Sequence, residues 1–258
     1  MRVSGTAVQS RQAEILRHLR RTGRAEVEAL ATLLHTTPQT IRKDLNALAA
    51  SGKVLRFHGG ASLLAGVEYT AFEVRRAIAA EQKEAIGREI ARRIPDNVAI
   101  FLNSGTTTAA VARHLSRHAG LLVLTDSVQM ADALRVHPGL DVVVPGGTVR
   151  QSDGAILGEQ AVDFVRQFRV DIAVVGAAAI GEDGSLLDFD LREAALLRVV
   201  LDGARTAILA ADSSKFDRVA PVRGGHLSQI RQFVTDPACP PRLRHLCRTL
   251  GVALIEAR

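Results

Sequence analysis

The chain has 258 residues, of which 47% are hydrophobic and 3% aromatic, so it is long enough for one small domain and one larger domain with an aliphatic core. Its two cysteines, Cys239 and Cys247, are too few for a disulfide framework or a zinc site. No apolar run is long enough to cross a bilayer and the first residues have no signal-peptide pattern, so we expect a cytoplasmic protein that uses no membrane, metal or cofactor.

The formal net charge of +6 is unevenly distributed along the chain. Ten Lys and Arg residues but only four Asp and Glu residues precede Ala61, whereas the remainder holds 23 of each kind. A basic block joined to a neutral one is typical of proteins that bind a polyanion with one domain and do something else with the other. We therefore expect a DNA-binding domain over residues 1–60, a linker over residues 61–81 and a second domain over residues 82–258.

The N-terminal block reads as three helices and a strand. Apolar residues at helical spacing predict helices over residues 11–21 and about 25–34. Thr37 suits an N-cap and Pro38 the first position of a third helix, which would bury Ile41, Leu45 and Leu48. Residues 53–58 alternate as a short strand that ends at two glycines.

Two helices joined by a tight turn, with a polar outer face on the second, predict a helix-turn-helix that enters the major groove. Gln39 could contact adenine, and Arg42 or Lys43 could contact guanine or phosphate. Arg56 and His58, on a hairpin wing, could contact the DNA backbone or the minor groove. The alternative is that Arg42 and Lys43 form a solvated helix face, which the concentration of charge disfavours. The candidate DNA-binding residues are Thr37, Gln39, Thr40, Arg42, Lys43, Arg56 and His58.

The larger block alternates strands and helices, which predicts a doubly wound and mostly parallel sheet. Predicted strands cover residues 98–102, 121–125, 141–144, 172–175 and 206–211, and predicted helices cover residues 109–117, 127–136, 160–166 and 191–202. Ligands of such sheets bind beyond the carboxyl ends of the strands. The loops that follow these strands are therefore the places to look for a site.

A Ser/Gly/Thr loop, residues 103–108, joins the first of these strands to a helix. Backbone N–H groups, hydroxyls and the helix dipole converge in such a loop, as a phosphate requires. It has neither the Gly-Lys-Ser/Thr of a Walker A loop nor a GxGxxG dinucleotide pattern. By itself the loop is weak evidence, because most loops of this kind are plain helix caps.

Two segments of the chain, residues 37–46 and 55–61, resemble the signature of the DeoR family of bacterial transcription regulators. Three further segments, residues 153–159, 163–169 and 183–190, resemble particular members of that family. The resemblance covers nearly the whole chain and implies an α/β protein: a small α+β winged helix-turn-helix domain, then a sensor with a doubly wound sheet of the ribose-phosphate isomerase type. The last three segments are most similar to the branch of the family that controls the glycerol 3-phosphate regulon.

The resemblance also implies an effector site. It assigns the phosphate of a sugar-phosphate-like effector to the Ser/Gly/Thr loop, ligand contact to Lys215 and hydroxyl contact to Asp126. Glu193 matches a recurrent acid of the family, although it and Arg150 could equally be surface residues. The candidate effector-binding residues are Asn103, Ser104, Gly105, Thr106, Thr107, Asp126, Gly146, Gly147, Arg150, Glu193 and Lys215. The family commonly has Asp at position 103 and Asn at position 126, so this chain exchanges acid and amide across one cleft.

These features predict a repressor of a carbon-source operon that binds operator DNA as a dimer or tetramer. A phosphorylated polyol or sugar, with glycerol 3-phosphate as the first candidate, would release it. The alternative is an isomerase-like enzyme fused to a nucleic-acid-binding domain. Isomerisation of a sugar phosphate needs a carboxylate base, and residues 176–181, where the related isomerases have acids, contain none. A non-specific nucleic-acid module is disfavoured by the balanced charge of the larger block.

Overall fold

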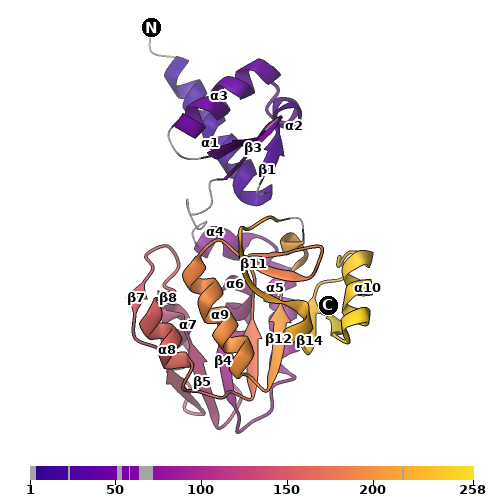
Figure 1. Ribbon diagram of the computed structural model, residues 1–258. Helices are drawn as coiled ribbons and strands as arrows, with labels where there is room; N and C mark the ends of the chain where they lie inside the picture. The colour runs from indigo at the N-terminus through magenta and orange to yellow at the C-terminus, as the bar shows by residue number, and fades with distance from the viewer. Residues whose placement is uncertain (1–3, 23, 51–53, 58, 64–71, 217) are drawn as a thin grey trace. The chain divides into compact units, whose positions relative to one another are not determined.

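The computed structural model describes residues 4–22, 24–50, 54–57, 59–63, 72–216 and 218–258, which fall into two compact units (Figure 1). The first, N-terminal unit comprises residues 1–69 together with residues 218–220, and the second, C-terminal unit comprises residues 70–217 and 221–258. None of the described helices is long and apolar enough to span a lipid bilayer.

The N-terminal unit is a winged helix. Its elements are α1 (Ser4–Thr22), β1 (Arg24–Glu26), α2 (Val27–Leu33), α3 (Pro38–Ala50), β2 (Val54–Phe57) and β3 (Gly60–Leu63). The three strands form an antiparallel sheet in the order β1-β3-β2, and the helices pack on it around buried Ile15, Leu30, Ile41, Leu45 and Leu48. The predicted helix-turn-helix and its buried face are therefore confirmed.

Two boundaries in this unit differ from the sequence prediction. The second helix begins at Val27 rather than near Ala25, because Arg24–Glu26 pairs with β3 as a strand. The wing continues past the predicted domain end at residue 60, since Ala61 lies opposite Ala25 and is fully buried. Both differences come from a pairing between segments far apart in the chain, which local helical periodicity does not report.

The C-terminal unit is built on seven parallel strands in the order β15-β14-β12-β9-β4-β5-β6, which confirms the predicted doubly wound sheet. The strands are β4 (Ala99–Leu102), β5 (Leu121–Thr125), β6 (Leu140–Val143), β9 (Ile172–Val175), β12 (Thr206–Ala210), β14 (Gln232–Thr235) and β15 (Ala253–Glu256). The chain leaves β4 toward β5 and β6 on one side and then returns to β9 on the other. The strand order therefore reverses between β4 and β9, where ligands of such sheets bind.

Helices cover both faces of the sheet (Figure 1). They are α4 (Phe72–Ala77), α5 (Ala80–Ala91), α6 (Thr106–Arg113), α7 (Val128–Leu134), α8 (Glu159–Val165), α9 (Leu191–Gly203) and α10 (Pro241–Leu250). Phe101 of β4 packs with buried residues of α8, α9 and α10, whereas its neighbours Ile100 and Leu102 pack with those of α5, α6 and α7. This alternation is why each strand reads as a continuous apolar run.

Shorter elements complete the unit. They are β7 (Thr148–Val149), β8 (Ile156–Leu157), β10 (Ala179–Ile180), β11 (Ser185–Asp188), β13 (Val222–His226) and the 3-10 turns η1 (Ser213–Lys215) and η2 (Leu227–Gln229). Among the elements that the sequence did not predict, α4 falls inside the expected linker, and α5 begins at that linker's last two residues. Residues 64–71 of that linker lie outside the described part of the chain.

Candidate functional site

The outer face of α3 carries the predicted DNA-binding side chains. Gln39, Arg42 and Lys43 are exposed, and Thr40 is half-buried. The Thr37 hydroxyl accepts a hydrogen bond from the Thr40 backbone N–H at 3.2 Å and so acts as the predicted N-cap. Because this cap holds the first turn of α3, Thr37 positions the exposed side chains that follow it.

Arg42 makes an ion pair with Glu28 of α2, with 3.2 Å between Nη2 and Oε1. The two side chains are 54% and 69% exposed, and an exposed pair of this kind contributes little to stability. A DNA phosphate or guanine could therefore replace Glu28 as the partner of Arg42 at small cost.

A buried ion pair fixes α3 against α1, and the sequence analysis missed it. Asp44 is 3% exposed and accepts hydrogen bonds from Arg11 Nε at 2.5 Å and from Gln12 Nε2 at 3.4 Å. The Asp44 contact raises the pKa of the Arg11 guanidinium. These contacts join α3 to α1 beside the buried Leu45.

The wing contributes less than predicted to the described surface. Arg56 of β2 is half-buried, and its Nη1 atom is buried with no hydrogen-bond partner among the described residues. His58, the other predicted wing contact, lies outside the described residues.

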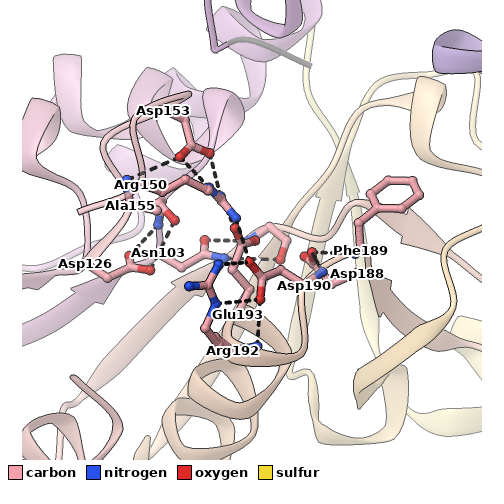
Figure 2. Close-up of polar contacts among 12 residues, drawn as sticks. Asn103, Asp126, Arg150, Asp153, Ala155, Asp188, Phe189, Asp190, Arg192 and Glu193 are labelled. Carbon is pink, nitrogen blue, oxygen red and sulfur yellow. Dashed lines mark hydrogen bonds and ion pairs between the residues drawn. The ribbon is translucent and has the colours of Figure 1, made fainter. Parts of the chain in front are cut away.

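In the C-terminal unit, Asn103 lies at the point where the strand order reverses. Its Oδ1 accepts a hydrogen bond from the Gly176 N–H at 2.8 Å, and its Nδ2 lies 3.4 Å from the Gly176 carbonyl oxygen (Figure 2 shows Asn103). The Asn103 side chain thus joins the loops that follow β4 and β9. This double role needs both an acceptor and a donor, which an amide has and a carboxylate lacks.

Asp126, at the end of β5, is held by Ser104. Its carboxylate accepts hydrogen bonds from the Ser104 N–H at 2.5 Å and from the Ser104 hydroxyl at 3.1 Å. Burial raises the pKa of Asp126 to about 7, although both Ser104 hydrogen bonds act in the opposite direction. With this pKa, the Asp126 carboxyl changes its charge near neutral pH.

The Ser/Gly/Thr loop leads directly into α6, which starts at Thr106 rather than at the predicted residue 109. Gly105 is the N-cap and provides no side-chain acceptor for the first-turn N–H groups. Thr106 and Thr107 are each 4% exposed, and the Thr108 hydroxyl donates within the loop to the carbonyl of Asn103 at 2.7 Å. The start of α6 is therefore a place where an anion could accept from the backbone.

A pocket opens beside these residues. It is lined by Phe101, Asn103, Ser104, Asp126, Asp188, Glu193, Leu196 and Leu197. Four predicted site residues thus come together: Asn103, Ser104, Asp126 and Glu193. Gly146 and Gly147, which are exposed, and Lys215, which is buried in η1, are not among the described residues that line this pocket.

Asp188 and Glu193 form a carboxyl pair in the pocket. Burial raises the pKa of Asp188, while hydrogen bonds from the N–H groups of Asp190 and Phe189 and one with Glu193 act to lower it. The Asp188 carboxylate accepts from Phe189 N–H at 2.6 Å and from Asp190 N–H at 3.2 Å. The sequence analysis missed Asp188 because it searched the ends of parallel strands, whereas β11 is antiparallel.

Arg150 is held by carboxylates rather than directed into the pocket (Figure 2). It bonds both oxygens of Asp153, at 2.8 and 2.6 Å, and also makes a short ion pair with Glu193. Its Nη1 lies 3.2 Å from Asp190 Oδ2. With 14% of its side chain exposed, Arg150 is not a surface residue, and whether it contacts the effector stays a prediction.

Family models match both units. The DeoR-like helix-turn-helix domain matches residues 11–66, and the DeoR C terminal sensor domain matches residues 78–237. The chain belongs to the DeoR family. The DeoR architecture inferred from the five sequence segments is thereby confirmed.

Among curated DeoR relatives, the chain is 38% identical over 227 residues to the glycerol-3-phosphate regulon repressor of Escherichia coli (strain K12), covering 88% of this chain and 90% of that protein. It is 39% identical to the Haemophilus influenzae protein of the same name, covering 87% and 88%. It is also 37% identical to the HTH-type transcriptional repressor CsqR of Escherichia coli (strain K12), covering 95% and 94%. This DeoR chain is thus related to proteins named as repressors. Its identity to the two glycerol-3-phosphate regulon repressors, 38% and 39%, is nearly the same as its identity to CsqR, 37%.

Solved structures similar to this DeoR chain include ribose 5-phosphate isomerase A of Methanocaldococcus jannaschii, with a TM-score of 0.39, 18% identity and coverage of 54% of this chain and 55% of that one. Another is eIF2B delta of Chaetomium thermophilum, with a TM-score of 0.47, 13% identity and coverage of 77% and 63%.

Proposed function

We propose that this chain is an effector-controlled transcriptional repressor of a carbon-source operon and acts on DNA in the cytoplasm. Its N-terminal unit would bind operator half-sites with the exposed face of α3, and its C-terminal unit would bind a phosphorylated polyol or sugar. The single observation that supports this most is the pocket at the β4/β9 reversal point, where acidic and hydroxyl side chains lie beside the uncapped start of α6.

The chemistry of the pocket favours a ligand with hydroxyl groups at one end. Asn103, Asp126, Asp188 and Glu193 offer acceptors for hydroxyls. Three acids in one pocket repel a phosphate, so the phosphate would lie toward the N–H groups at the start of α6 and toward Lys215. We take glycerol 3-phosphate as the first candidate effector, since two of the relatives are named for its regulon.

Repeated half-sites call for more than one basic unit, so we propose that the protein works as a homo-oligomer, either a dimer or a tetramer. The effector would lower DNA affinity only to the extent that it prefers the state that does not bind DNA.

An isomerase is the second candidate, because Asp126 and Asp188 are buried carboxyls with raised pKa values in one pocket, as general bases often are. We favour binding without turnover, for two reasons. The loop after β9 contains Gly176, Ala177 and Ala178 and no acid. Relatives over most of the chain are named as repressors. Incubation with ribose 5-phosphate, followed by NMR detection of ribulose 5-phosphate, tests this choice, and turnover would favour the enzyme.

The decisive experiment is fluorescence anisotropy with DNA from upstream of the chain's own gene, at fixed salt. We expect saturable, sequence-dependent binding that weakens when glycerol 3-phosphate is added. Binding that ignores glycerol 3-phosphate but responds to another sugar phosphate would correct the effector, and binding without sequence preference would remove the repressor proposal.

A further inference from the structure

We propose that a chain of ion pairs, Glu193–Arg150–Asp153–Arg75, transmits effector binding from the pocket to α4, the first described element after the winged helix. This inference rests on the proposed function, because it concerns the regulation of the same site. It assigns Arg150 a positioning role instead of direct contact with the effector, and it gives Arg75 and Asp153 a role that their sequence positions do not suggest.

The chain of contacts starts in the pocket wall. Glu193 lines the pocket and makes a short ion pair with Arg150 Nη2. Both side chains are largely buried, with 10% of Glu193 and 14% of Arg150 exposed. A ligand hydroxyl that bonds Glu193 therefore meets a carboxylate that is already the partner of one particular guanidinium.

The carboxylate of Asp153 joins the two halves of this series of ion pairs. Asp153 is 3% exposed and accepts from Arg150 Nε and Nη2 at 2.8 and 2.6 Å. The same Asp153 Oδ2 also accepts from Arg75 Nη2 at 2.8 Å. Two cations thus share one buried oxygen, so they repel each other and compete for the lone pairs of the same acceptor.

The last ion pair of the series holds α4, which two further contacts also anchor here. The Phe72 N–H, at the start of α4, donates to the Ser152 carbonyl at 3.3 Å, next to Asp153. At the other end of α4, Lys83 Nζ donates to the Arg75 carbonyl at 2.6 Å and makes a short bond to the Ile78 carbonyl. The position of α4 therefore depends on the conformation of the loop that carries Asp153.

A ligand changes this balance through charge. When a hydroxyl takes up acceptor capacity of Glu193, Arg150 loses part of its hold on that carboxylate and bonds Asp153 more strongly. The hydrogen bond from Arg75 to Asp153 then weakens, and α4 loses one of the contacts that hold it in place. Because α4 is the first described element after the winged helix in sequence, a shift of α4 is the outcome by which we propose that ligand binding is transmitted.

A double-mutant cycle tests the coupling in the ligand-free protein. Arg75→Gln and Glu193→Gln remove charge at the two ends, and the observable is the midpoint of thermal unfolding. We expect the midpoint loss of the double variant to differ clearly from the sum of the single losses, because both residues act through Arg150 and Asp153. The control cycle uses Arg93→Gln in place of Arg75→Gln. Arg93 pairs with Glu89 on α5, outside the series of ion pairs, so the midpoint losses in this cycle should be additive. Additivity in both cycles would overturn the proposal.

The functional arm measures operator affinity with and without glycerol 3-phosphate, together with binding of that ligand by calorimetry. In Arg75→Gln we expect wild-type ligand affinity and wild-type DNA affinity, while the ligand-induced loss of DNA affinity falls from about tenfold or more to about twofold or less. Arg75→Lys keeps the charge if the glutamine variant folds poorly, and should respond in between. Full release of DNA in a variant that binds the ligand would overturn the proposal. A wild-type protein that ignores glycerol 3-phosphate would refute the proposed effector instead, and the cycle would still decide the coupling.

Discussion

Asp126 and Ser104 are joined by two hydrogen bonds across the loops that follow β5 and β4. The Ser104 N–H donates at 2.5 Å and the Ser104 hydroxyl at 3.1 Å. An acid with two donors would normally have a lowered pKa, yet burial outweighs both and raises the pKa of Asp126 to about 7. The pair therefore keeps a carboxyl in the pocket whose charge depends on pH in the physiological range.

Replacing Asp126 by Asn should change how stability depends on pH. The pKa of Asp126 is about 7 in the folded chain against an ordinary value of 3.8, so the wild type loses stability as pH rises from about 4 to about 7. Asp126→Asn removes this loss while keeping an acceptor for the Ser104 N–H. At 1.36 kcal/mol per pKa unit, the gain at pH 8 is at most about 4 kcal/mol.

Urea unfolding at pH 4.5 and pH 8 measures this effect. We expect the free energy of unfolding of Asp126→Asn to be clearly higher than that of the wild type at pH 8, and only slightly higher at pH 4.5. The control Asp132→Asn, an exposed acid of α7, should shift both values little. An equal gain of Asp126→Asn at both pH values would mean that titration of Asp126 is not the cause.

Arg42→Ala should weaken operator binding by about tenfold and reduce the salt dependence of binding by about one phosphate contact. The reason is that Arg42 is exposed on α3 and, in the described part of the chain, makes an exposed ion pair with Glu28. Anisotropy titrations at several salt concentrations measure both quantities. Glu28→Gln is the matched control: it removes the competing carboxylate and should keep or strengthen DNA binding. Unchanged affinity in Arg42→Ala would remove this residue from the interface.

Much of this architecture could be predicted because its signals are local. The Thr37 cap, the buried face of α3 and the apolar runs of β4, β5 and β9 are visible as spacing in the sequence. The Asn103, Ser104 and Asp126 cluster could be predicted as well, since parallel strands bring their carboxyl ends to one edge of the sheet.

The parts that could not be predicted depend on contacts between distant segments. β1 becomes a strand only because β3 pairs with it, and Asp188 reaches the pocket from an antiparallel strand outside the main sheet. The ion pairs of Arg150 could not be predicted, because two of its carboxylate partners, Asp190 and Glu193, are 40 and 43 positions away in the sequence. A single sequence shows which residues are charged, but it does not show which of them form ion pairs in the fold.

Helix α5 gives a third prediction because it contains Gly87, which normally weakens a helix. A Cβ at Gly87 would lie 2.6 Å from the backbone carbon of Ala110 and 2.7 Å from its oxygen, so glycine is what allows α5 and α6 to pack this closely. Gly87→Ala should therefore destabilise the C-terminal unit by about 1–3 kcal/mol, despite a gain in helix propensity of about 1 kcal/mol. Chemical denaturation measures the change.

Gly203→Ala is the matched control for that prediction. Gly203 ends α9, and a Cβ there would lie 3.4 Å from the Phe168 oxygen, an ordinary contact. This variant should be neutral or slightly more stable than the wild type. If Gly87→Ala behaved in the same way, close packing of α5 on α6 would not be the reason for the glycine.

Lys215 is the last residue of η1, which follows β12 and has Asp212 as its N-cap. If Lys215 binds the effector phosphate, Lys215→Ala removes a charged hydrogen bond worth about 1.5–3 kcal/mol. The effector concentration for half-maximal release of DNA should then rise by about tenfold or more, while operator affinity without effector stays within about twofold of the wild type.

The control for Lys215 must remove one positive charge without approaching the pocket. Arg166→Ala does so, because Arg166 is 63% exposed on the surface after α8 and pairs only locally with Asp163 in the described contacts. It should leave both operator affinity and the effector response unchanged. A Lys215→Ala protein that released DNA at the wild-type concentration of glycerol 3-phosphate would exclude Lys215 from the phosphate site and leave the start of α6 as the remaining candidate.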